Sequence, residues 1–89
     1  MCIFFSCLRM CNHQNVVNFI GASVSPICIV TEFVDGCNMY DLIHDPTAQY
    51  TWKLVKQMAL EAAMGIDHLH QKKIVHRDLK SLNLLVCYS

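Results

Sequence analysis

A long amphipathic segment, residues 52–70, constrains the fold of this 89-residue sequence more than any other part. Its apolar residues recur at spacings of three and four, which places them on one face of a helix. Thr51 is a suitable N-cap for this helix. Because the apolar face must be buried, another layer of structure has to pack against it. The residues of this face are Val55, Met58, Ala59, Ala62, Ile66 and Leu69.

Strand signals come before this helix. The β-rich stretch 16–23 and the apolar run 27–34 are separated by the turn pair Ser25-Pro26. The second run is nearly continuous and rich in β-branched residues, which is typical of a strand covered on both faces. The stretch 38–44 predicts a short helix with Asn38 as its cap.

The remaining elements are short. The spacing in residues 1–11 predicts a helix, and Asp35-Gly36 is an interruption that we do not expect a strand to follow. Residues 74–75 and 84–86 predict two very short strands around a polar loop. Strands followed by helices, without βαβ repetition, favour an α+β fold.

Composition limits the partners. The chain has seven basic and seven acidic residues, so its net charge is zero, and we expect no nucleic-acid or membrane surface. Apolar residues make up 54% of the sequence, which is high for so short a chain. We therefore expect exposed apolar surface that binds a partner or causes aggregation.

The six cysteines show no C-x-x-C pair. Residues 1–11 lack the features of a signal peptide and are too short to span a membrane. We therefore expect free, mostly buried thiols in a cytoplasmic protein.

The polar loop, "HRDLKSLN" at residues 76–83, carries the candidate chemistry. Asp78 can accept a proton from a hydroxyl group or help to hold a metal ion. Asn83 offers a neutral oxygen ligand for a hard cation such as Mg²⁺, and Lys80 can neutralise a phosphate. The alternative interpretation is a solvated, salt-bridged turn.

The spacing of this loop matches the H-R-D-L-x-x-x-N catalytic loop of protein kinases. The sequence therefore resembles the eukaryotic protein kinase family, over roughly residues 5–86. The stretches 13–22, 27–36 and 58–80 are similar to other segments of that family. The Lys two positions after the Asp is typical of Ser/Thr kinases, and the sequence is most similar to the tyrosine-kinase-like group, including Raf-like and mixed-lineage kinases.

The resemblance implies a partial kinase fold. Residues 1–34 would be the remainder of the N-lobe, 35–37 the hinge and 38–89 the start of the C-lobe. The expected parts are the end of the N-lobe helix, two strands, the hinge, a short and a long helix, the catalytic loop and the strand after it.

The resemblance also implies roles in the loop. Asp78 would be the catalytic base, Lys80 would stabilise the transferring phosphoryl group, and Asn83 would bind Mg²⁺. His76 would be structural, packing with Leu8 and Phe19.

The same resemblance implies an ATP site. Thr31 would lie behind the adenine, Glu32 and Val34 would offer backbone groups to its edge, Asn38 would lie near the ribose, and Leu85 would form the floor. Only the backbones of Glu32 and Val34 would matter, and the apolar residues can equally be ordinary core.

Several kinase parts are missing from these 89 residues, including the Gly-rich loop, the strand Lys and D-F-G. Phe4 stands where the resemblance places the Glu that pairs with that Lys. We therefore expect an internal kinase fragment that is inactive alone, although its parent would act on protein substrates. A non-catalytic binding module is an alternative, and a small Cys/His metal protein is a weaker one.

Overall fold

The computed structural model describes residues 2–3 and 12–87 of the chain. Two α-helices, one short 3-10 helix and five strands make up the described part. The strands are β1 (Cys2–Ile3), β2 (Phe19–Val24), β3 (Ile27–Thr31), β4 (Gly36–Asn38) and β5 (Leu84–Cys87). The helices are α1 (Met39–His44), α2 (Trp52–Gln71) and the 3-10 helix η1 (Ser81–Asn83).

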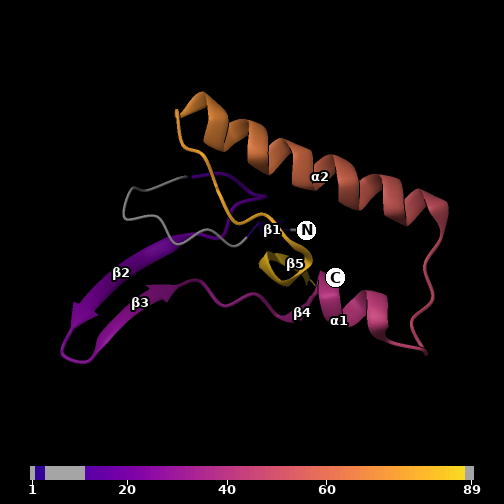
Figure 1. Ribbon diagram of the computed structural model, residues 1–89, viewed down its shortest axis with the longest axis horizontal. Helices are drawn as coiled ribbons and strands as arrows, with labels where there is room; N and C mark the ends of the chain where they lie inside the picture. Colours follow the sequence, from indigo (N-terminus) through magenta and orange to yellow (C-terminus); the bar gives the residue numbers. More distant parts are fainter. Residues whose placement is uncertain (1, 4–11, 88–89) are drawn as a thin grey trace.

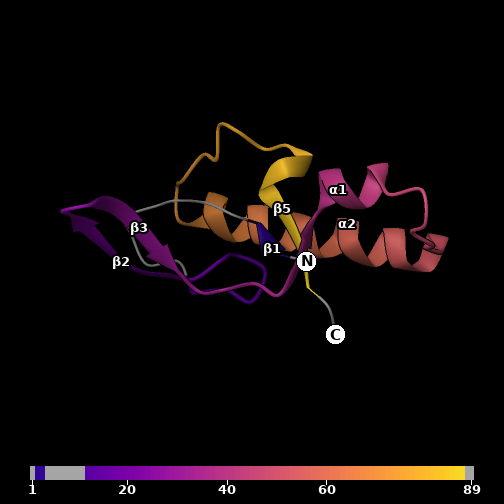
Figure 2. The ribbon, with the colours of Figure 1, turned by 90° about the horizontal axis from the view of Figure 1, so that it is seen from below.

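The strands form two separate antiparallel sheets. Strands β2 and β3 make a hairpin, and β5 lies between β1 and β4 in a small three-stranded sheet. The hairpin projects from one end of the molecule, while the small sheet and α1 lie beside α2 (Figures 1 and 2). This arrangement of small sheets and helices is the α+β fold expected from the sequence.

Helix α2 begins and ends with local hydrogen bonds. The Thr51 hydroxyl oxygen accepts from the backbone N–H of Leu54 at 3.2 Å, which confirms the predicted N-cap. At the other end, the N–H of Lys73 donates to the His70 carbonyl, and the N–H of Ile74 donates to the Leu69 carbonyl, both at 2.9 Å. These two bonds form a Schellman motif, in which Lys73 adopts the left-handed conformation with φ 60°.

Helix α1 is also where the sequence predicts it. The side chain of Asn38 accepts from the N–H of Asp41 at 2.8 Å and caps the helix. Just after the helix, the Asp45 carboxylate accepts from the backbone N–H and the hydroxyl of Thr47, at 2.9 and 2.7 Å. These bonds lower the pKa of Asp45 below its ordinary value, and the Thr47 hydroxyl contributes most.

The core lies between the segment before β2 and one face of α2. Val16, Val17, Met58 and Leu69 are the buried apolar residues among those described, and Ile66 and Ile74 pack against Val16 and Leu69. The predicted stripe of α2 is therefore only partly covered: Met58 and Leu69 are buried, whereas Ala59 is exposed. Hydrophobic burial in the described part is correspondingly small.

Three expectations about strands are wrong. The run 27–34 is not covered on both faces, because β3 ends at Thr31 and its first four residues are exposed. A strand, β4, does follow Asp35, and it exists because Gly36 allows close pairing with β5. Residues 74–75 are not a strand, because Ile74 completes the α2 C-terminus instead.

Two expectations concern the start of the chain and the thiols. Cys2–Ile3 is a strand rather than helix, since it pairs with Leu84 and Leu85, and residues 4–11 lie outside the described residues. Cys28 and Cys87 are exposed and Cys37 is half-buried, so the cysteines whose burial the structure describes are not the mostly buried thiols that we expected. None of the helices in the described segments combines the length and apolar character needed to cross a membrane.

The register of β4 and β5 leaves no room at one position. Gly36 lies opposite Cys87, and Cys37 lies opposite Val86. A Cβ atom on Gly36 would collide with the backbone carbonyl of Val86. Glycine is therefore required here by the close approach of two backbones, and the pairing places Asn38 directly opposite Leu85.

Candidate functional site

The loop between α2 and β5 folds back on itself at η1. The N–H of Asn83 donates to the Lys80 carbonyl at 2.9 Å, which closes the single turn of η1. Because η1 reverses the chain direction, the side chain of Asn83 returns to Asp78, five positions earlier. The sequence-predicted residues of the loop are thus brought together by one short turn.

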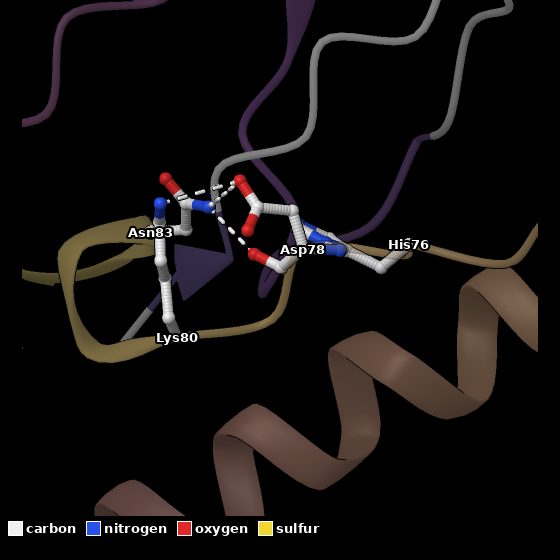
Figure 3. Close-up of polar contacts among 4 residues, drawn as sticks. All are labelled: His76, Asp78, Lys80 and Asn83. Atoms are coloured by element: carbon white, nitrogen blue, oxygen red, sulfur yellow. Dashed lines mark hydrogen bonds and ion pairs between the residues drawn. The ribbon is translucent and has the colours of Figure 1, made fainter.

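Asn83 and Asp78 are in direct contact (Figure 3). The Asn83 Nδ2 donates to the backbone carbonyl of Asp78 at 2.7 Å and lies 3.4 Å from its Oδ2. The Lys80 Nζ lies 3.5 Å from the same Oδ2, and the side chains of Lys80 and Asp78 are 52% and 67% exposed. An ion pair this exposed contributes little stability. Because most of the Asp78 side chain is exposed, its carboxylate is accessible to a substrate.

His76 and Arg77 shape the backbone before Asp78. The Nδ1 of His76 accepts from the N–H of Asp78 at 3.1 Å. Arg77 has φ 69°, which is uncommon for a residue with a side chain. The half-buried His76 therefore has a structural contact, while its expected partner Leu8 lies outside the described residues.

The expected adenine-site residues lie along β3, the linker that follows it, and the small sheet. Thr31 ends β3, and Glu32 and Val34 belong to residues 32–35, hereafter the 32–35 linker. Asn38 and Leu85 are side by side across β4 and β5. The amide oxygen of Asn38 is already used to cap α1, and its contact with a ribose stays a prediction.

Two cavities adjoin these residues. A polar cavity of about 490 Å³ is lined by Glu32 and Val34. Thr31, Asn38 and Leu85 are not among its lining residues. An apolar cavity of about 320 Å³ lies between α1, α2 and the start of β5. The remaining lining residues of the polar cavity are Asn12, His13, Gln14, Asn18, Phe33, Asp35 and Cys87. The five adenine-site candidates are therefore not gathered around one cavity.

Sequence reasoning missed the side chain of Glu32. Its Oε1 accepts from the N–H of Asn18 at 2.8 Å, and its own N–H donates to the Asn18 carbonyl at 2.9 Å. The two residues are fourteen positions apart, so no local pattern in the sequence indicates the contact. The ring contact between His13 and His68, with centroids 4.8 Å apart, was also not predicted for the same reason.

Comparison with known proteins identifies the family. The family model described as "Protein tyrosine and serine/threonine kinase" matches residues 4–89. The chain belongs to the protein kinase family. The match confirms the family and the partial α+β kinase fold that the catalytic-loop pattern predicted.

Individual kinases are similar over most of the chain. Serine/threonine-protein kinase STY46 of Arabidopsis thaliana is 42% identical over 81 residues, covering 89% of this chain and 14% of that protein. Probable serine/threonine-protein kinase drkB of Dictyostelium discoideum is 43% identical over 83 residues, covering 89% and 12%. Dual specificity protein kinase pyk3 of the same organism is 37% identical over 81 residues, covering 91% and 6%. The chain thus spans less than a sixth of each of these relatives.

Proposed function

We propose that this segment supplies the catalytic loop and part of the ATP site of a protein kinase that phosphorylates Ser and Thr hydroxyls of protein substrates. The observation that carries the proposal is the hydrogen bond from Asn83 to the Asp78 carbonyl, which brings together the candidate base and the candidate Mg²⁺ ligand. The serine/threonine-protein kinases among the relatives support the choice of acceptor.

Asp78 acts as the general base. Its carboxylate is exposed, while its backbone is held on both sides, by His76 at the N–H and by Asn83 at the carbonyl. A substrate hydroxyl that donates to this carboxylate is oriented for attack and loses its proton to it as the new bond forms. A residue with a fixed backbone and an exposed carboxylate suits this role.

Lys80 stabilises negative charge next to the base. Its Nζ is already drawn toward Asp78, and its side chain is half-exposed. When a phosphoryl group lies against Asp78, the ammonium can bind its oxygens, where negative charge is spread in the transition state.

The loop also suits a Mg²⁺ ion. The Nδ2 of Asn83 is used by Asp78, which leaves the amide oxygen Oδ1 as a hard, neutral ligand of the kind that Mg²⁺ prefers. Asn83 would hold the ion, which when bound neutralises phosphate charge. No group of three or more His, Cys, Asp or Glu side chains suited to a metal occurs within residues 2–3 and 12–87.

The nucleotide binds along β3, the 32–35 linker and β5. The Glu32 carbonyl and the Val34 N–H would bond the edge of adenine, with Thr31 behind it, Leu85 beneath it and Asn38 near the ribose. The register supports the last two positions, because Asn38 at the end of β4 lies opposite Leu85, and Leu85 is one residue from the end of β5 that follows the catalytic loop.

We further propose that the 89 residues alone do not transfer phosphate at a useful rate. Phosphoryl transfer depends on positioning and charge neutralisation. The sequence contains the base but not the Gly-rich phosphate loop, the Lys–Glu pair or D-F-G. Incubation of the purified chain with radiolabelled ATP and a generic protein substrate should give no incorporation, whereas labelling that Asp78→Asn abolishes would contradict this proposal.

A hybrid kinase tests the role of the segment. Residues 12–87 would replace the aligned stretch of Arabidopsis STY46, and kcat would be measured on a Ser/Thr substrate. We expect Asp78→Asn to lower kcat by about 10²–10⁴, since the general base is lost. Lys80→Met should lower it by roughly 10²–10³, since transition-state charge is left uncompensated.

The matched control is Asp67→Asn, at an exposed position of α2 whose carboxylate accepts from Gln71 rather than from a residue of the loop. It should leave kcat unchanged. A folded hybrid whose activity is insensitive to Asp78→Asn would rule out the proposed catalytic role of this loop.

A further inference from the structure

Three polar groups of Glu32 form hydrogen bonds within the chain. Its N–H donates to the Asn18 carbonyl at 2.9 Å, and its Oε1 accepts from the Asn18 N–H at 2.8 Å. Its carbonyl accepts from the Thr31 hydroxyl at 3.2 Å. One residue is thus held by its backbone donor, its backbone acceptor and its side chain at once.

The position of Glu32 makes this arrangement informative. Strand β3 ends at Thr31 and β4 begins at Gly36, so the 32–35 linker lacks regular strand pairing. The reciprocal bonds between Asn18 and Glu32 attach the start of this linker to the segment that leads into β2. These bonds continue the pairing of the hairpin one residue beyond β3, into the first residue of the linker.

The Glu32 carbonyl keeps capacity for a ligand. A backbone carbonyl oxygen has two lone pairs, and the Thr31 hydroxyl uses one. The second is available to a donor such as an exocyclic amine. Because the Thr31 hydroxyl and the Asn18 bonds fix the residue on either side of its Cα, the direction of this lone pair is set before a ligand arrives.

We propose that the Glu32 carboxylate and the Thr31 hydroxyl are positioning groups that orient the Glu32 carbonyl toward the exocyclic amine of adenine. This inference rests on the proposed adenine site and goes beyond the expectation that only the backbone of Glu32 matters there. Preorganised acceptors improve binding because no ordering cost is incurred on association. The two side chains therefore set selectivity for a 6-amino purine over a purine without that amine.

The test compares two ligands that differ only in the amine. Adenosine and purine riboside are titrated into the ¹⁵N-labelled 89-residue chain, and the amide shifts of Val34 and Leu85 report binding. The unsubstituted chain should prefer adenosine by about fivefold, the worth of one neutral hydrogen bond. Thr31→Val and Glu32→Ala should each reduce this preference to about twofold or less, while affinity for purine riboside stays the same.

Conservative variants separate positioning from a general loss of structure. Thr31→Ser keeps a hydroxyl donor and Glu32→Gln keeps the Oε1 acceptor, so both should retain the preference for adenosine. Hydrogen exchange at the Asn18 amide should accelerate in Glu32→Ala but not in Glu32→Gln. Val24→Thr, at the exposed tip of the hairpin, controls for indirect effects.

The outcomes distinguish this inference from the adenine site itself. If the unsubstituted chain prefers adenosine and all variants do so equally, the positioning role is wrong and the site stands. If the unsubstituted chain shows no preference, the adenine assignment of Glu32 is wrong, and the inference fails with it. Unchanged Asn18 exchange in Glu32→Ala would also overturn it.

Discussion

At the scale of single residues, the structure is held largely by side chains that bond the backbone. Asn38 and Thr51 cap helices, Glu32 bonds the Asn18 backbone, and His76 and Asn83 hold Asp78 from either side. Each such bond is worth about 1 kcal/mol. Because few apolar residues are buried in the part that the structure describes, these bonds define local geometry there more than the core does.

The pair Asp45 and Thr47 gives a pH-dependent prediction. The Thr47 hydroxyl and N–H lower the pKa of Asp45, so the unfolded chain holds this proton to a higher pH than the folded chain does. The resulting stabilisation is fully present above the ordinary carboxyl pKa and is lost as the pH falls through the lowered value. Thr47→Val should raise the pKa of Asp45 in an NMR titration, because the hydroxyl contributes most.

Thr47→Ser is the control for this titration, since it keeps the hydroxyl. It should leave the pKa of Asp45 low. An equal pKa in Thr47→Val and the unsubstituted chain would show that the hydroxyl does not act on the carboxylate.

Gly36 gives a steric prediction. Gly36→Ala should destabilise the chain by roughly 2–3 kcal/mol, because the new Cβ meets the Val86 carbonyl and neither backbone can move without breaking the β4–β5 pair. The measurement is the urea midpoint followed by circular dichroism. Gly21→Ala is the matched control: nothing lies within 4 Å of its added Cβ, and its midpoint should hardly change. Equal midpoints for the two variants would contradict the close approach at Gly36.

At the scale of elements, helix ends were predictable and strand environments were not. The caps at Thr51 and Asn38 depend on residues three positions away, so the sequence contains the whole signal. The exposure of β3 depends on what lies beside it, which the run of β-branched residues does not encode. The short strand β4 was missed because its cause, the approach of Val86 to Gly36, joins residues fifty positions apart.

The candidate site shows the same contrast between contacts within a short stretch of sequence, which are predictable, and contacts between distant residues, which are not. The proximity of Asp78, Lys80 and Asn83 could be expected from the sequence, because all three lie within one short loop, and their catalytic roles stay predictions. The involvement of the Glu32 side chain was missed, because Asn18 reaches it only when the hairpin has formed.

The C-terminus of α2 gives a prediction at this scale. Lys73 occupies the left-handed position of the Schellman motif, where glycine is usual. Lys73→Gly should stabilise the chain by about 0.5–1 kcal/mol, because the strain of a left-handed side-chain residue exceeds the added flexibility of glycine in the unfolded chain. The thermal midpoint should rise.

The neighbouring Lys72→Gly is the matched control. Lys72 has φ −85°, an ordinary value, so glycine there brings only the flexibility cost and should lower the midpoint. If both variants lowered it equally, the left-handed conformation of Lys73 would be contradicted.

At the scale of the whole molecule, apolar surface is left uncovered. The hairpin, the 32–35 linker and one end of α2 expose large side chains, among them Phe33 of the linker at 87% and Trp52 of α2 at 81%. The described part measures 41 × 30 × 23 Å, yet few of its apolar residues are buried. We therefore expect marginal stability and self-association of the isolated chain. Sedimentation as a monomer together with a high urea midpoint would count against this expectation.

The tip of the hairpin offers a direct test. Val24 and Ile27 face each other across the turn and are 88% and 90% exposed. The double substitution Val24→Thr and Ile27→Thr should reduce self-association in sedimentation velocity, because it removes apolar surface at an unpaired strand edge. The free energy of unfolding, obtained from urea titration, should change by no more than about 0.5 kcal/mol, as is usual at exposed positions. Buried Val16→Thr, the control, should lower the midpoint markedly.

The place of β5 in its sheet bears on how the protein is made. It is the central strand, yet it is the last described element to be synthesised, and both of its neighbours precede it in the chain. On the ribosome, β1 and β4 must therefore wait without a partner until residues 84–87 emerge from the exit tunnel. Because β5 pairs with strands that lie far before it in the sequence, the sheet has a high contact order. High contact order slows folding and prolongs the time in which nascent strands can bind chaperones.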